Sequence, residues 1–212
     1  VLAGLRRLIA LIATMLRLSL VRHGQTAFNA QGRVQGWLDV PLDETGRAQA
    51  EKLAQHFRGQ DVQVIYTSPL VRAAHTARVI AEACGCRVIA DERLREYHMG
   101  DWSGLTREEI LALPSTTRET AAVELQIPNG ERADQVHARV SAWLRDVLAR
   151  HEGQTVLAVS HGGTLGALLA TMLGLPVARR QPFSFANASV TEVHHDGQRW
   201  HLRMLNSLCH LC

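Results

Sequence analysis

The chain has few aromatic residues, few cysteines and little net charge. Aromatic residues make up 5% of its 212 residues, and only four cysteines are present. The formal net charge of +3, with no block of five or more Lys or Arg, gives no reason to expect a nucleic-acid partner. The composition of 46% hydrophobic and 20% charged residues is typical of one globular domain with a full core.

The four cysteines fall into two pairs, Cys84-Gly85-Cys86 and Cys209-His210-Leu211-Cys212. Such pairs can form the two halves of a metal site. However, Cys84 fits the apolar face of a helix, and the second pair lies where chains commonly fray. We therefore expect no metal and free thiols in a reducing cytoplasm.

The first 14 residues resemble a signal peptide but lack one of its features. Arg6 and Arg7 precede an apolar run at residues 8–13, yet no A-x-A cleavage site separates this run from the strand that follows. The run is also too short to span a bilayer. We expect residues 1–14 to be an apolar extension, either translated from an upstream start or serving as an amphipathic surface anchor, and residues 15–212 to form a single domain.

Two predicted strands end in a histidine followed by glycine. Residues 18–22 lead into His23-Gly24, and residues 155–160 lead into His161-Gly162-Gly163. The second strand is almost entirely apolar, which is typical of a central strand buried on both faces. Since an open α/β sheet carries its active site at the carboxyl ends of its strands, both histidines are expected at one edge. The glycine in His23-Gly24 would let the chain approach an anion closely.

Helical and strand patterns alternate along the rest of the chain. Helices are predicted at 45–58, 69–84, 106–111, 132–150 and 164–173, further strands at 62–67 and 87–90, and a hairpin at 190–195 and 199–205 with a two-residue turn. This order predicts an α/β fold with an antiparallel addition at one sheet edge. The apolar residues of 114–130 follow neither the helical nor the strand period. We expect this segment to form a partly helical excursion near the site, with the character of a lid.

Two arginines occupy positions that suit an anion. Arg22 precedes His23 and offers a planar fork of donors that matches phosphate oxygens. Ser68 is predicted to cap a helix whose first residue is Pro69, which places Arg72 in the first turn, beside the positive end of the helix dipole. A lone Arg on a helix is ordinarily a solvated surface residue, but the strand-Ser-Pro-helix context favours phosphate contact for Arg72.

The candidate site residues include more cationic groups than their one carboxylate, Glu96, can balance. These groups are Arg22, His23, Arg72 and His161. A dianionic phosphate would balance them. A neutral His23 could attack phosphorus if its other ring nitrogen donates to a backbone carbonyl. Arg22, Arg72 and a protonated or donating His161 would stabilise the equatorial oxygens. Glu96 would protonate the leaving oxygen and then take a proton from water, so no metal or cofactor is required.

The sequence resembles the histidine phosphatase superfamily, also called the phosphoglycerate mutase-like family, over nearly the whole chain from Met15 onward. The resemblance rests on five motifs in order: Arg22-His23-Gly24-Gln25-Thr26 with Asn29, Gly32-Arg33 and Gly36; Pro41-Leu42 with Gly46; Ser68-Pro69-Leu70 with Arg72-Ala73 and Thr76-Ala77; Glu96 with Gly100, Trp102 and Gly104; and Ser160-His161-Gly162-Gly163.

This resemblance implies a three-layer α/β/α sandwich with a mostly parallel central sheet. It also implies a phosphohistidine at His23, an acid/base role for Glu96, and phosphate ligation by the side chains of Arg22, Arg72 and His161. Further residues implied at the substrate are Gly24, Asn29, Gln35 and Gly162. For Asn29 and Gln35 the alternative is a role in holding the loop.

Two side chains near Glu96 have alternative interpretations. His98 lies two residues after it and could touch substrate or pack the loop, and Asp101 could compete as the acid, although its place beside Trp102 favours a turn role. His75, on the predicted helix with Arg72, is expected to be structural.

The phosphatase branch of the family fits better than the mutase branch. Tyr97 follows Glu96 where the mutase pattern has an Arg, and the region between Glu96 and His161 is short for a mutase. We expect a metal-independent hydrolase of small phosphorylated metabolites in the cytoplasm, without nucleic acid or a membrane span, and with oligomers possible. The alternatives are a cofactor-dependent phosphoglycerate mutase and a non-catalytic phospho-ligand module, which would need neither a nucleophile nor an acid.

Overall fold

A single six-stranded sheet forms the centre of the molecule, with strand order β3-β2-β4-β1-β5-β6. The computed structural model describes residues 15–113, 127–178 and 181–212. The predicted extension at 1–14 and most of the predicted excursion, 114–126, lie outside the described residues. The strands are β1 Leu16–Arg22, β2 Val64–Thr67, β3 Arg87–Ala90, β4 Thr155–Ser160, β5 Val190–His195 and β6 Trp200–Ser207.

The sheet is mostly parallel, as predicted. Strands β3, β2, β4 and β1 run parallel, and the β5-β6 hairpin joins β1 in the antiparallel sense. Arg22 pairs with Ser160, and Thr67 pairs with Val159, so β1, β4 and β2 end at nearly the same height. The residues that directly follow these three strands therefore share one edge of the sheet.

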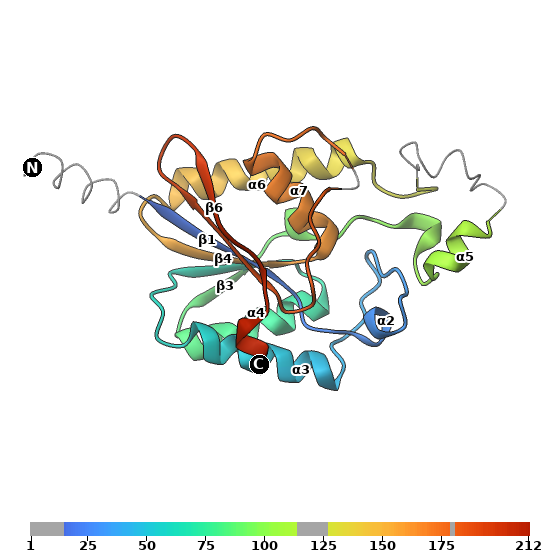
Figure 1. Cartoon of the computed structure of the whole chain (residues 1–212), viewed down its shortest axis with the longest axis horizontal. Coiled ribbons are helices and arrows are strands. Elements are labelled where there is room, and N and C mark those ends of the chain that lie inside the picture. Colours follow the sequence, from blue (N-terminus) through green and yellow to red (C-terminus); the bar gives the residue numbers. More distant parts are fainter. Residues whose placement is uncertain (1–14, 114–126, 179–180) are drawn as a thin grey trace, which may run out of the picture.

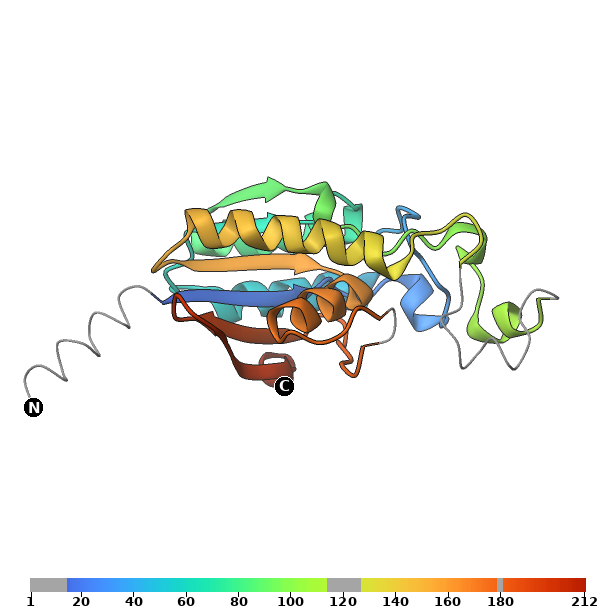
Figure 2. The ribbon, with the colours of Figure 1, turned by 90° about the horizontal axis from the view of Figure 1, so that it is seen from above.

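Helices cover both faces of the sheet, which confirms the three-layer α/β/α architecture (Figures 1 and 2). Helices α3 and α4 lie on one face, and α6 and α7 lie on the other. The helices are α2 Ala27–Ala30, α3 Glu44–Phe57, α4 Val71–Cys84, α5 Arg107–Leu111, α6 Ala133–Arg150 and α7 Gly162–Met172, and short 3-10 turns span Glu92–Leu94, Gly100–Trp102 and Cys209–Leu211.

The alternation of side chains along β4 explains why two helical layers form. Val156 and Ala158 belong to the core beneath α6 and α7, whereas Leu157 and Val159 belong to the core beneath α3 and α4. Successive side chains of a strand point to opposite faces, so an all-apolar strand needs cover on both. The prediction that this strand is central and doubly buried is confirmed.

The predicted start of the helix that carries Arg72 is wrong by two residues. Helix α4 begins at Val71, and the main-chain N–H of Val71 donates to the carboxylate of Asp39 at 2.6 Å. The Ser68 hydroxyl does not cap this helix: it accepts from the main-chain N–H of Leu70 at 3.3 Å and lies 2.8 Å from Nε2 of His161. A distant carboxylate and a distant histidine thus override the local Ser-Pro signal.

Other boundaries also differ from the predicted ones: β1 begins at Leu16, two residues early, and β2 begins at Val64, two residues late. The last hairpin pair is His195 with Trp200, so the connection comprises residues 196–199 and not a two-residue turn. The carboxylate of Asp196 accepts hydrogen bonds from the main-chain N–H groups of Gln198 and Arg199, which closes this longer loop. Helix α7 begins at Gly162, two residues before the predicted start.

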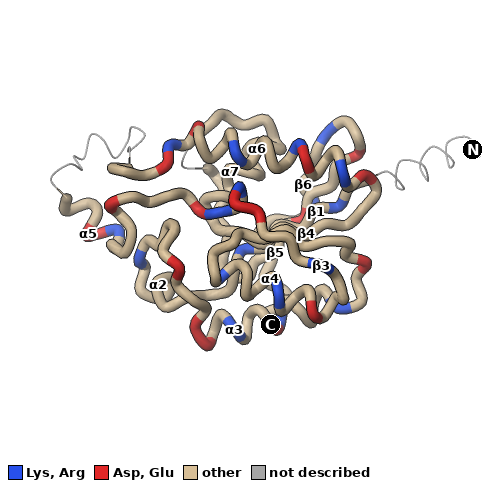
Figure 3. Tube along the Cα trace, turned by 180° about the vertical axis from the view of Figure 1, so that it is seen from behind, with Lys and Arg blue, Asp and Glu red and all other residues tan. Residues whose placement is uncertain are grey.

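Charged side chains of both signs are interspersed along the chain, with Lys or Arg and Asp or Glu together on α3, α4, α5 and α6 (Figure 3). Within the part of the chain that the structure describes, no helix is both long and apolar enough to cross a bilayer. All four cysteines are free thiols, Cys84 and Cys86 half-buried and the other two exposed.

Candidate active site

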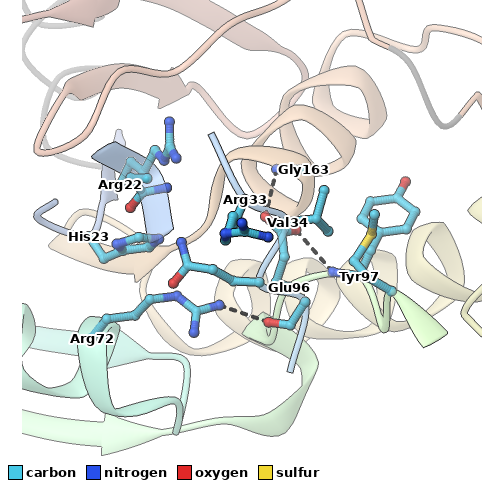
Figure 4. Close-up of a pocket in the computed structure, with 12 residues that line it drawn as sticks. Arg22, His23, Arg33, Val34, Arg72, Glu96, Tyr97 and Gly163 are labelled. Carbon is cyan, nitrogen blue, oxygen red and sulfur yellow. Dashed lines mark hydrogen bonds between the residues drawn. The ribbon is translucent and has the colours of Figure 1, made fainter. Parts of the chain in front are cut away.

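A pocket of about 300 Å³ opens where β1, β2 and β4 end. Its lining brings together most of the predicted site residues from segments far apart in the sequence (Figure 4). The lining residues are Arg22, His23, Asn29, Arg33, Val34, Gln35, Gly36, Arg72, Glu96, Tyr97, Met99 and Gly163.

The His23 ring is held in an orientation suited to nucleophilic attack. The side chain is 2% exposed, and its Nδ1 lies 2.7 Å from the carbonyl oxygen of Gly24. With Nδ1–H donating to this carbonyl, Nε2 keeps its lone pair. Burial, together with the charges of Arg22 and Arg72, lowers the pKa of His23 well below 6.5. The ring is therefore neutral, as a nucleophile must be.

His161 lies beside His23 and is fully buried, with the two ring centroids 5.0 Å apart. Its Nε2 lies 2.8 Å from the Ser68 hydroxyl, and its Nδ1 is buried without a hydrogen-bond partner among the described residues. Burial and then the charge of Arg72 lower the pKa of His161 well below 6.5. Of the two forms predicted for His161, the neutral donating form fits: Nε2 accepts from Ser68, and Nδ1–H is left for a ligand.

Arg22 and Arg72 each hold one buried donor without a partner. Arg72 donates through Nη1 to Leu38 O and through Nη2 to Gly36 O, both at 2.8 Å, and Arg22 donates through Nη1 to Phe185 O. Within the described chain, Nε of each arginine is buried and unpaired. Burial lowers both pKa values, that of Arg72 to about 10, so both groups stay cationic at neutral pH.

These unpaired donors suit an anion. A buried donor that makes no hydrogen bond costs about 1–3 kcal/mol, and the donors of Arg22, Arg72 and the neighbouring His161 could each be satisfied by an acceptor oxygen. A phosphate dianion offers several acceptor oxygens and two negative charges, which suit two guanidinium groups and one imidazole N–H. The structure thus has the charge and hydrogen-bonding requirements of a phosphate site.

Glu96 lies at the N-terminus of α7. Its Oε1 accepts from the main-chain N–H groups of Tyr97 at 2.9 Å and Thr164 at 3.1 Å, and its Oε2 accepts from Gly163 N–H at 3.1 Å. The early start of α7 at Gly162 presents the N–H groups of Gly163 and Thr164 in its first turn. The carboxylate is therefore held in one orientation on the rim of the pocket.

The main chain of Glu96 is held by Arg139, which the sequence analysis did not identify. Arg139 projects from α6 and donates to the carbonyl oxygens of Arg93 at 2.6 Å and Glu96 at 3.1 Å. It also forms a two-pronged ion pair with Glu131, whose Oε2 accepts from His98 N–H. An Arg within a long amphipathic helix gives no sequence signal that distinguishes it from a surface residue.

Replacing Arg139 with Met should lower kcat by about 10- to 100-fold and leave KM nearly unchanged, because the carboxylate of Glu96 shifts while the phosphate donors stay. The free energy of unfolding should fall by about 1–3 kcal/mol, since Glu131 loses its partner. Steady-state kinetics and urea unfolding measure both quantities. Arg145→Met, at an exposed position on the same helix, should change neither, and equal effects of the two variants would contradict this role.

The structure divides the other predicted substrate contacts into two groups. Asn29 and Gln35 line the pocket, and the Gln35 Oε1 is buried without a partner among the described residues. Asn29 also holds the loop, because its Oδ1 accepts from Thr26 N–H. Gly24 and Gly162 are not lining residues; a Cβ at Gly24 would lie 2.4 Å from Gly46 O, so its glycine is required by close backbone packing.

Two side chains near Glu96 have loop roles. Nδ1 of His98 lies 2.9 Å from Asn129 O, and the carboxylate of Asp101 accepts from Asn129 Nδ2 at 3.1 Å. Neither residue lines the pocket. Asp101 is thereby a turn residue and Glu96 is the carboxylate of the site.

Several lining residues were not predicted to contact substrate, namely Arg33, Val34, Gly36, Tyr97, Met99 and Gly163. Arg33 and Gly163 stand in recognisable motifs, which could have identified them. Asn187, whose Nδ2 donates to His23 O at 3.2 Å, stands in no motif, and only the fold brings it to His23. In the described ranges no group of three His, Cys, Asp or Glu side chains could hold a metal ion.

The two buried histidines predict a loss of stability in acid. Above pH 6.5 both are neutral in the folded and unfolded states and contribute nothing to the pH dependence. Below pH 6.5 these histidines take up protons only when the chain unfolds, because their pKa values in the folded state are lowered. The unfolded state then binds more protons than the folded state, so the free energy of unfolding falls as the pH falls. Each should contribute about 1.4 kcal/mol per pH unit.

Urea unfolding between pH 7 and pH 5 measures this effect. The free energy of unfolding should fall steadily over that range. The variant His23→Asn should take up about one proton fewer on unfolding, so its free energy of unfolding should depend less steeply on pH. A flat profile in the wild type would show that the rings are protonated in the folded protein.

Comparisons with known proteins agree with this geometry. The family model described as histidine phosphatase superfamily (branch 1) matches residues 18–208. The probable phosphoglycerate mutase GpmB of Serratia proteamaculans is 40% identical over 194 residues, covering 88% of each chain. Phosphoserine phosphatase 1 of Hydrogenobacter thermophilus is 39% identical over 202 residues, covering 93% of this chain and 95% of its own.

A solved structure shows the same fold. Mycobacterial glucosyl-3-phosphoglycerate phosphatase, described as a complex with VO3, superposes with a TM-score of 0.81 at 37% identity. The superposition covers 90% of this chain and 98% of the mycobacterial one.

Proposed function

Since this chain belongs to branch 1 of the histidine phosphatase superfamily, we propose that it hydrolyses phosphate monoesters through a phosphohistidine on His23. The chain is a phosphatase of small phosphorylated metabolites. One observation carries the assignment of its site. His23, with its neutral ring, lines a pocket together with Arg22 and Arg72, and buried N–H donors of these two arginines and of His161, which lies beside His23 and does not itself line the pocket, have no partner among the described residues.

In the first step, Nε2 of His23 attacks phosphorus as the bond to the leaving oxygen breaks. The electron pair of that bond passes to the leaving oxygen, which takes a proton from Glu96. Arg22 and Arg72 stabilise the charge on the equatorial oxygens, and His161 donates from Nδ1. The Gly24 carbonyl keeps His23 in the reactive tautomer throughout.

In the second step, water attacks the phosphohistidine. The new O–P bond forms as the N–P bond breaks, and the electron pair returns to Nε2 of His23. Glu96 takes the proton that water loses, so the acid is regenerated. The pocket is open to solvent on the side of Arg33, which is paired with Glu109 at 3.1 Å and is about one-third exposed.

Hydrolysis is favoured over isomerisation because, among the described residues that line the pocket, Arg33 is the one cation besides Arg22 and Arg72. Tyr97, at the position of the Arg in the mutase pattern, is 3% exposed and packs in the core. The charge of Arg33 is partly balanced by Glu109. A phosphorylated carboxylic acid that must be retained through two transfers therefore has little to hold it.

A panel of phosphorylated metabolites tests the assignment. Phosphate release should be observed with 5 mM EDTA present and should not depend on added metal, whereas interconversion of phosphoglycerates with a bisphosphate primer should be absent. Primer-dependent interconversion faster than phosphate release would establish a mutase instead. No turnover of any ester, with tight binding of phosphate, would leave only a binding module.

The compartment and the physiological partner belong to the same proposal. Four free cysteines fit a reducing cytoplasm, and a small phosphorylated metabolite fits the dimensions of the pocket.

A further inference from the structure

A second cavity, of about 260 Å³, lies next to the phosphate pocket. One wall is the first part of α7, with Gly162, Gly163 and Gly166, and the other is the segment that leads into β5, which runs alongside α7 (Figure 1). The residues of this second wall are Gln181, Phe183, Ser184 and Phe185. Since one water molecule takes up about 30 Å³ of liquid, the cavity has room for a ring.

The two cavities meet at Gly163. This residue lines both, and its N–H donates to Oε2 of Glu96 at 3.1 Å. In the proposed reaction the leaving oxygen must come within hydrogen-bond reach of Glu96. The atoms attached to that oxygen then lie beside Gly163, at the entrance to the second cavity.

The second cavity differs from the phosphate pocket in its chemistry. Among the described residues that line it, none is Lys, Arg, Asp or Glu, and its polar side chains are Gln181 and Ser184. Phe185 is buried and Phe183 is half-buried. Aromatic walls with a few neutral polar groups suit an uncharged ring, and none of the described residues that line this cavity would pair with an acidic leaving group.

We propose that this cavity binds the leaving group of the substrate and selects an uncharged ring, such as an aryl group or a sugar. The inference rests on the proposed function, because it takes the place of the leaving oxygen from the acid role of Glu96. It extends that function by assigning substrate selection to Phe183 and to the part of α7 that contains Gly162, Gly163 and Gly166.

Calorimetric binding of non-hydrolysable phosphonates tests the subsite without turnover. The wild type should bind naphthylmethylphosphonate about 10-fold more tightly than methylphosphonate. Phe183→Ala should remove this advantage and leave the affinity for methylphosphonate within twofold. Gly166→Leu, which fills the cavity opposite Gln181, should do the same. Leu202→Ala, at an exposed position on β6, is the matched control and should change neither affinity.

Three results would overturn the subsite. The wild type could show no preference for the aryl phosphonate, it could bind a carboxylate-bearing phosphonate more tightly, or the preference could be lost in Met99→Ala and kept in Phe183→Ala. The last result would place the leaving group against the outer wall of the phosphate pocket. Phosphate release from naphthyl phosphate is measured separately, so an inactive enzyme that still prefers the aryl phosphonate would refute the proposed function and support the subsite.

Discussion

His23→Ala is expected to lower kcat by about 10⁶-fold, the size of effect that follows removal of a catalytic nucleophile. The neutral ring of His23, held by the carbonyl of Gly24, is the group in the pocket that can accept the phosphoryl group. Single-turnover experiments with ³²P-labelled substrate, quenched in alkaline detergent, should trap an acid-labile, base-stable phosphoprotein in the wild type. His23→Ala should trap none.

The control for this experiment is His75→Ala, on the same helix as Arg72 and outside the pocket, which should keep kcat within about twofold. Phosphate should still bind to His23→Ala, since the donors of Arg22, Arg72 and His161 remain. If His23→Ala retained most of its turnover, water would be attacking phosphorus directly, and the covalent route would be wrong.

Glu96→Gln should lower kcat by about 10²- to 10⁴-fold for an alkyl phosphate, because the leaving alkoxide loses its proton donor. The loss should be much smaller for p-nitrophenyl phosphate, whose leaving group departs without a proton. The difference between the two substrates, measured as kcat under single-turnover conditions, separates acid catalysis from general damage to the pocket.

Asp101→Asn is the matched control for Glu96→Gln. It changes a carboxylate in the same loop, one that accepts from Asn129 and does not line the pocket, so both substrates should be turned over within about twofold of wild type. A leaving-group-dependent loss in Asp101→Asn, and none in Glu96→Gln, would reverse the assignment of the acid.

Most of the secondary structure was predictable because local signals and burial agree. The strand at Thr155–Ser160 has the bounds that its apolar run predicts, and α4 ends at Gly85, whose φ of 68° suits glycine. The helix at Arg107–Leu111 begins after Thr106 with the predicted capping box. In each case the nearest residues in sequence decide the conformation.

Predictions were wrong where a distant residue competes for a local signal. Ser68 could cap the following helix, but it pairs with His161, and Asp39 caps the helix in its place. The hairpin turn has a Gly at the expected position, yet the side chain of Asp196 closes a longer loop. In both cases a polar side chain forms hydrogen bonds with groups that the folded chain brings close to it. Sequence spacing alone does not identify those groups.

The sequence by itself determined the succession of helices and strands along the chain and the residue types at the phosphate site, because apolar periodicity and the ends of strands depend on neighbouring residues. The family resemblance implied the layers, and the spatial order of the strands came from the tertiary structure. Only the tertiary structure decided which groups are unpaired and which are held. The neutral state of His161, the support of Glu96 by Arg139 and the cavity at Phe183 arise from burial and from contacts between remote segments. Desolvation and hydrogen bonding across the fold are properties of the packed chain, so no local pattern can specify them.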